Sequence, residues 1–101
     1  MNYIEQIADE IWQENWQEGD PDDIPQAERL LYRIYAVLCL TKGDDVTWSD
    51  VHDAWSAWQS ETMPDHRSII PFDELDDRVQ RMDEPYARAI RVVARRRGFA
   101  Q

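Results

Sequence analysis

A chain of 101 residues, 43% of them hydrophobic, has room for one domain with one core, and this composition argues against wholesale disorder. Its net charge of −10 argues against binding of nucleic acid by the whole surface, because so negative a field repels phosphate. No apolar run approaches the length of a membrane span and no secretory signal is present, so we expect a cytoplasmic protein. We expect a single domain over residues 1–101, with a helical pair in residues 1–45 and a second region in residues 46–101.

Two amphipathic helices are predicted in the N-terminal region. The first is expected from about Tyr3 to Trp16, and its apolar positions fall at helical spacing: Ile4, Ile7, Ala8, Ile11 and Trp12. Gly19–Asp23 is rich in helix breakers and is expected to be an exposed acidic loop. Pro25 suits the first turn of the second helix, which is the predicted centre of the core. Its apolar face is predicted to hold Leu30, Leu31, Ile34, Val37, Leu38 and Thr41, widened by Tyr35, Cys39 and Leu40.

A third helix is predicted from Trp48 to about Ser60. Thr47 followed three residues later by Asp50 is typical of a capping box, which begins a helix. The apolar side of this helix is predicted to carry Val51, Ala54, Trp55 and Trp58. His52 is expected at the edge of that side.

The remaining segment ends in a fourth helix. Ser68–Phe72 is short and apolar, so we expect an extended Ile-Ile-Pro segment pressed on the core, followed by a brief helical turn at Asp73–Asp77. Asp83 is the predicted N-cap of the last helix, Pro85 suits its first turn, and Gly98 is expected to end it. The predicted class is all-α, with four main helices in a small single-core bundle and one or two short helical turns.

Several residue types in the C-terminal half recur at fixed intervals. They are His66, Ile69, Ile70, Pro71, Phe72, Leu75, Asp83, Gly98 and Phe99, preceded by the segment Val51–Trp55. This pattern resembles the RyR domain, the repeat named after ryanodine receptors, over about half of the chain. The resemblance implies a non-catalytic binding module, and a nucleotide-sensing role has been suggested for some members. The whole chain also looks like short proteins of actinobacteria and their phages.

Patterns for catalysis and for metal binding are missing. His52 and His66 lack a third ligand at a zinc-type spacing, so no metal is expected. Adjacent acid pairs are more simply explained as caps and solvated loops than as catalytic carboxylates. No Gly-x-Ser-x-Gly motif occurs, and three glycines are too few for a phosphate-cradling loop. We therefore expect neither enzymatic activity nor a cofactor.

Tryptophan is the residue type that most suggests a binding role. Trp48 and Trp55 have His52 between them, which is compatible with one aromatic wall that stacks a base or receives an apolar side chain. The alternative is a well-filled core with one tryptophan packed under Ile69–Phe72. We expect a groove that binds a nucleotide-type small ligand or a protein partner. Its candidate residues are Trp48, His52, Trp55, His66, Arg67, Phe72, Tyr86 and Arg88.

Charge is unevenly distributed along the chain. Residues 1–60 carry thirteen acidic and three basic side chains, whereas residues 61–101 carry eight of each. An alternative hypothesis is therefore an acidic interaction protein, derived from a phage or an actinobacterium, that occupies a basic surface of a host protein. A homodimer through the tryptophan-rich face is a third hypothesis. Arg95–Arg97 could bind phosphate, complement the negative end of the last helix, or pair with acids of the first half.

Overall fold

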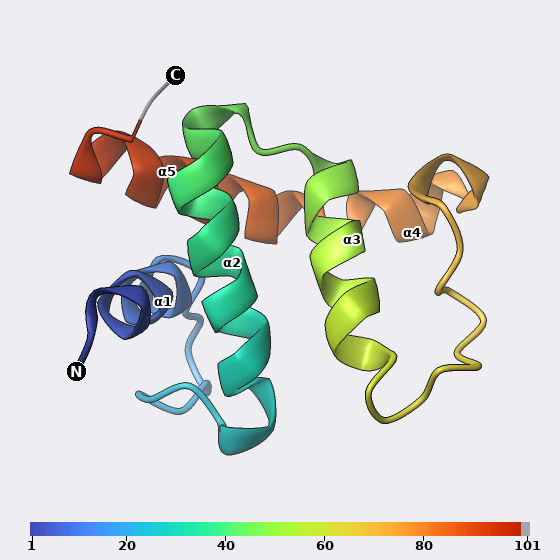
Figure 1. Cartoon of the computed structure of the whole chain (residues 1–101), viewed down its shortest axis with the longest axis horizontal. Helices are drawn as coiled ribbons and strands as arrows, with labels where there is room; N and C mark the ends of the chain where they lie inside the picture. The colour runs from blue at the N-terminus through green and yellow to red at the C-terminus, as the bar shows by residue number, and fades with distance from the viewer. Residues whose placement is uncertain (100–101) are drawn as a thin grey trace.

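The computed structural model describes residues 1–99, and within that range the chain forms helices, turns and loops only. In chain order the elements are α1 (Tyr3–Glu14), η1 (Gln26–Glu28), α2 (Arg29–Lys42), η2 (Gly43–Asp45), α3 (Trp48–Gln59), η3 (Phe72–Glu74), α4 (Asp77–Arg81) and α5 (Glu84–Arg97), where η marks a 3₁₀ turn. Figure 1 shows α2 and α3 side by side, with α5 crossing both and α1 packed beside α2. The predicted all-α class with four main helices is confirmed. No helix among the described residues is long and apolar enough to cross a membrane.

Helix α1 has the predicted buried face. Ile7, Ala8, Ile11 and Trp12 are buried, and the Asn2 side chain caps the helix by accepting the Glu5 N–H at 2.9 Å. The helix ends at Glu14, before the predicted Trp16. Both tryptophan side chains instead reach the following loop, because the indole N–H groups of Trp12 and Trp16 each donate to the Pro21 carbonyl at 3.1 Å. The acidic loop is thereby held against α1.

Helix α2 forms as predicted, but its buried face was predicted wrongly in part. The core takes Leu31, Tyr32, Tyr35, Ala36 and Cys39, whereas Leu30 and Val37 are 50% and 47% exposed. Because α2 is apolar along almost its whole length, its sequence permits more than one buried face. Packing against the neighbouring helices determines which face is buried. Here the Tyr32 ring packs edge-on against two other rings, with centroid distances of 5.3 Å to Trp12 and 5.1 Å to Tyr35. These large rings bury more area than leucine does.

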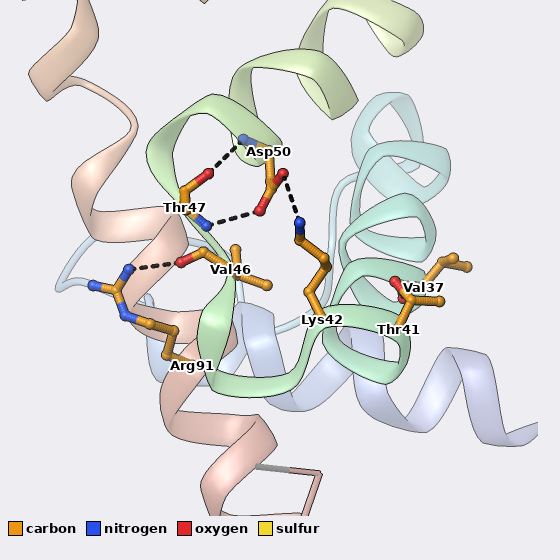
Figure 2. Close-up of polar contacts among 7 residues, drawn as sticks. All are labelled: Val37, Thr41, Lys42, Val46, Thr47, Asp50 and Arg91. Carbon is orange, nitrogen blue, oxygen red and sulfur yellow. Dashed lines mark hydrogen bonds and ion pairs between the residues drawn. The ribbon is translucent and has the colours of Figure 1, made fainter. Parts of the chain in front are cut away.

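Helix α3 begins with the predicted capping box. The Thr47 hydroxyl accepts the Asp50 N–H at 3.1 Å, and the Asp50 carboxylate accepts the Thr47 N–H at 2.9 Å (Figure 2). The same view shows Lys42 pointing to the Asp50 carboxylate. The two charged groups lie 3.6 Å apart, so this ion pair connects the end of α2 to the start of α3. Arg91 of α5 donates to the Val46 carbonyl at 2.9 Å just ahead of the box (Figure 2). The α2–α3 connection is therefore fixed from both neighbouring helices.

His52 was predicted at the edge of the apolar side of α3, and that placement is wrong. The side chain is only 4% exposed and lies in the buried layer with Val51 and Ala54. Its ring Nε2 lies 2.7 Å from the Ile70 carbonyl oxygen, and this hydrogen bond makes burial of a polar ring tolerable. The bond also attaches the Ile-Ile-Pro segment to α3, although the Ile70 side chain itself is 39% exposed.

Helix α5 begins and ends at the predicted residues. Gly98 has a left-handed φ of 80°, and the Phe99 N–H donates to the Ala94 carbonyl at 2.7 Å, which closes the helix. Pro85 lies in the first turn, as expected. Asp83 occupies the N-cap position, as predicted, but its backbone is helical (φ −83°, ψ −12°) and its side chain makes no capping hydrogen bond. Its carboxylate is consequently free for another role.

Arg95–Arg97 pair with acids elsewhere in the fold. Arg95 lies 3.4 Å from Asp44 of η2, Arg96 bonds Glu14, and Arg97 bonds Glu10 of α1. Of the three hypotheses for this cluster, pairing within the chain is the one observed. It joins the acidic N-terminal helix to the basic end of α5.

Candidate functional site

The main cavity of the described part of the chain, about 510 Å³, lies among four segments. These are the start of α2, helix α3, the loop 66–68, and the junction of α4 with α5. A volume of this size is typical of pockets that hold a small organic ligand. The cavity is therefore the candidate functional site.

The α3 wall of the pocket is aromatic. His52, Trp55 and Trp58 follow one another at helical spacing and all line it. The Trp55 ring stacks on His52 with centroids 5.8 Å apart and meets His66 of the loop edge-on at 5.1 Å. Because these neighbours restrain Trp55, its ring is held in one orientation at the pocket wall.

The two histidines at the pocket hold the loop in place. A carbonyl oxygen only accepts hydrogen bonds, so His52 Nε2 must carry the proton that it shares with Ile70. Ser56 Oγ lies 3.4 Å from the same nitrogen, which has no lone pair left to activate the hydroxyl as a nucleophile. His66 Nδ1 accepts the Ser68 N–H at 3.0 Å. Across residues 1–99, no three His, Cys, Asp or Glu side chains are arranged to hold a metal ion.

Asp83 is the acidic group on the opposite wall, which α4 and the start of α5 provide. Its burial raises the pKa of the carboxyl to about 6, with the nearby His52 acting in the lowering direction. Within residues 1–99 the carboxylate has no hydrogen bond or ion pair. A half-buried, unpaired carboxylate at a pocket wall is the kind of group that a ligand satisfies.

Two tyrosines and a second acid, Glu28, line the pocket together with Asp83. Tyr35 and Tyr86 both line the pocket, with ring centroids 6.0 Å apart. Burial raises the pKa of both hydroxyls, and the charges of Glu28 and Asp83 raise them further, so both tyrosines stay neutral hydrogen-bond donors. The pocket thus has an electronegative end between η1 and the start of α5.

Two arginines also line the pocket: Arg67 from the loop and Arg78 from α4. Neither has an ion-pair partner within the described residues. The contrast with α5 is clear, because Arg91 pairs with Glu84 and the cluster Arg95–Arg97 pairs with acids of the first half. The cationic side chains left for a ligand therefore include the two at the pocket.

A family model described as "Domain of unknown function (DUF7701)" matches residues 2–95 of the chain. The chain belongs to the DUF7701 family. Comparison with curated proteins and with solved structures gave no significant match. The resemblance to RyR domains is wrong, because the family found is a different one and covers α1 and α2, which the RyR pattern leaves out.

The residues behind that resemblance have structural roles in this DUF7701 chain. His66 accepts a backbone N–H of its own loop, and Pro71 precedes the turn η3. Leu75 is buried, and Gly98 ends α5. Local requirements for a turn, a buried side chain and a helix end recur in unrelated helical proteins, so their spacing alone does not identify a family.

Five of the eight candidate residues line the pocket of this DUF7701 chain: His52, Trp55, His66, Arg67 and Tyr86. Trp48 instead donates its indole N–H to Glu84. Phe72 lies behind His52, with ring centroids 6.2 Å apart. Arg88 is exposed on α5 and does not line the cavity.

Sequence reasoning missed six polar or aromatic residues of the pocket: Glu28, Tyr35, Trp58, Ser68, Arg78 and Asp83. Trp58 carried a usable signal, since it follows Trp55 by three residues on the predicted face. Asp83 was predicted as the N-cap of the last helix, so it was not considered as a pocket residue. Nothing in the sequence connects Glu28 or Arg78 to α3, because the fold alone brings their segments there.

Proposed function

We propose that this protein is a non-catalytic binding module whose pocket takes a small ligand of the nucleotide type, with a ring and an anionic group. The observation that carries the proposal is a pocket with an aromatic wall and unpaired charges of both signs. A ring would pack on Trp55 and Trp58, and an anionic group would meet Arg67 and Arg78.

Electrostatics support a ligand at this place. An unpaired charge that is partly removed from water costs free energy, and folded chains usually avoid it by pairing or by full exposure. Within the described residues, Asp83 is neither paired nor fully exposed, whereas three arginines of α5 form ion pairs with acidic side chains. A bound ligand with a complementary donor group would supply the missing partner.

The proposal assigns binding to the pocket without a reaction. Nucleophilic catalysis would need a hydroxyl or thiol beside a base with a free lone pair. The Nε2 atom of His52 donates its proton to the Ile70 carbonyl, so it has no free lone pair for the nearby Ser56 hydroxyl. Cys39, the free thiol, is buried in the core and does not line the pocket. Binding is the activity that this arrangement supports best.

Titration with AMP, GMP, CMP and UMP, followed by tryptophan fluorescence and by the melting temperature, tests the proposal. A saturable quench of Trp55 or Trp58 and a higher melting temperature are expected with at least one nucleotide. Arg67→Ala with Arg78→Ala should weaken binding at least tenfold, whereas the exposed control Arg88→Ala should not. If none of the four nucleotides changes either signal, the proposal is wrong.

A second candidate function rests on the acidic loop after α1. Glu18, Asp22 and Asp23 are exposed and make no ion pair within residues 1–99, and Trp12 and Trp16 hold the loop in position. A fixed acidic edge suits a protein partner with a basic surface. Neutralising these three acids to amides should abolish salt-sensitive capture of a basic partner. The same change at the exposed acids Asp73, Glu74 and Asp77 should not.

A further inference from the structure

The electronegative end of the pocket determines which ring fits there. Asp83 and Glu28 are carboxylates, and an ionised carboxylate only accepts hydrogen bonds. Both acids line the same cavity, together with the tyrosines Tyr35 and Tyr86. A ring that enters this end must present hydrogen-bond donors.

Nucleobases differ in the edge that they offer. Guanine has two adjacent donors, N1–H and the exocyclic N2 amino group, which match the two oxygens of one carboxylate. Adenine places the lone pair of N1 beside its amino group, and that lone pair would point at an acceptor-only oxygen. A site that leaves a buried polar group unpaired rejects the wrong ligand strongly.

We propose that the pocket selects guanine nucleotides over adenine nucleotides through the Asp83 carboxylate, which would accept both donors of the guanine edge. This inference rests on the proposed function and adds the ligand's identity to it. Glu28 assists by keeping the region acceptor-rich, while Trp55 and Trp58 provide the aromatic wall beside it.

The arrangement of the remaining charges agrees with this orientation. Arg67 and Arg78 line the same cavity from the loop 66–68 and from α4, and neither forms an ion pair with Asp83. A nucleotide has its phosphate and the donor edge of its base at opposite ends, so one molecule can reach both groups.

Asp83 is also a suitable position for a selective substitution. Its side chain neither caps α5 nor forms an ion pair, so Asp83→Asn removes no hydrogen bond or ion pair of the fold. The amide keeps one acceptor oxygen and adds an N–H₂ donor, which complements the adjacent donor and acceptor of adenine. The substitution should therefore change the preferred base while the fold is retained.

Isothermal titration calorimetry with GMP and AMP at neutral pH tests the inference. GMP should bind at least tenfold more tightly than AMP to the unmodified chain, and guanosine should bind more weakly than GMP because it lacks the phosphate. Asp83→Asn should lower the GMP preference to threefold or less, or reverse it. Asp53→Asn, an exposed position on α3 that does not line the pocket, is the matched control and should keep the preference.

Two results separate the possible failures. If nucleotides bind but AMP equals or exceeds GMP, or if Asp83→Asn leaves the preference unchanged, the guanine inference is wrong and the binding module stands. If no nucleotide binds, both proposals fail. Glu28→Gln gives an independent check should Asp83→Asn fold poorly, since it should weaken GMP at least threefold and leave AMP unchanged or tighter.

Discussion

Replacing Asp83 with asparagine is expected to stabilise the folded protein at neutral pH. A carboxyl whose pKa rises from 3.8 to about 6 on folding has its ionised form destabilised by about 3 kcal/mol, at about 1.4 kcal/mol per pH unit. Asp83 is only half-buried, so solvent screening reduces this to roughly 1–2 kcal/mol. Asparagine has nearly the same shape and no charge, and it removes that cost.

The pH dependence of this gain has a defined sign. Because burial raises the pKa of Asp83 in the folded state, the folded chain binds more protons than the unfolded chain between about pH 4 and pH 6. The contribution of Asp83 to the free energy of unfolding therefore falls as the pH rises through this window. The advantage of Asp83→Asn should be nearly complete above about pH 6, should be small by pH 4, and should vanish below about pH 3, where the carboxyl is protonated in both states.

Urea unfolding of the unmodified chain and of Asp83→Asn, followed by tryptophan fluorescence across this pH range, measures the difference. Asp53→Asn controls for the loss of one negative charge from the surface and should change the free energy of unfolding by less than about 0.5 kcal/mol. An Asp83→Asn variant that is less stable than the unmodified chain at neutral pH would refute the reasoning. So would a stability gain that persists unchanged to pH 4.

Three further substitutions test how the fold is assembled. Leu31→Ala should reduce the free energy of unfolding, measured in urea, by about 2–4 kcal/mol, because Leu31 is buried. Leu30→Ala should reduce it by less than about 1 kcal/mol, because Leu30 is half-exposed, and equal losses would contradict the observed face of α2. His52→Ala should cost about 2–4 kcal/mol, because the Ile70 carbonyl loses its donor and a cavity remains, and faster proteolysis near Ile70 should accompany it. Gly98→Ala should lower thermal stability by about 1 kcal/mol, because alanine disfavours the left-handed φ of 80°; an unchanged melting temperature would show that the turn relaxes.

The ends of a helix depend mainly on a few neighbouring residues, such as capping side chains, proline and glycine, so they can be predicted from the sequence. The Thr47–Asp50 box, Pro85 and Gly98 act within one turn of the positions that they terminate, so the ends of α3 and α5 were predictable. The apolar period of α1 likewise identified its buried face, because only one side of that helix is hydrophobic.

Other features depended on neighbours that the sequence does not specify. The apolar run of α2 allowed several faces, and contact with Trp12 on one side and Tyr86 on the other selected the one with Tyr32 and Tyr35. His52 was predicted at an edge because a polar ring disfavours burial, but the Ile70 carbonyl supplied a partner from eighteen residues away. Long-range hydrogen bonds and ring contacts of this kind have no local signature.

The sequence by itself determined the all-α class, most helix ends, the aromatic content of α3 and the acidic surplus, because each depends on residue type and short-range spacing. The tertiary structure decided which charges are left for a ligand. It paired Arg95–Arg97 with acids of α1 and η2, and it brought Arg67, Arg78 and Asp83 to the same pocket as Trp55 without ion-pair partners of their own. Charge pairing is a property of distances in space, so only the folded chain could separate the arginines that stabilise the fold from those that face a pocket.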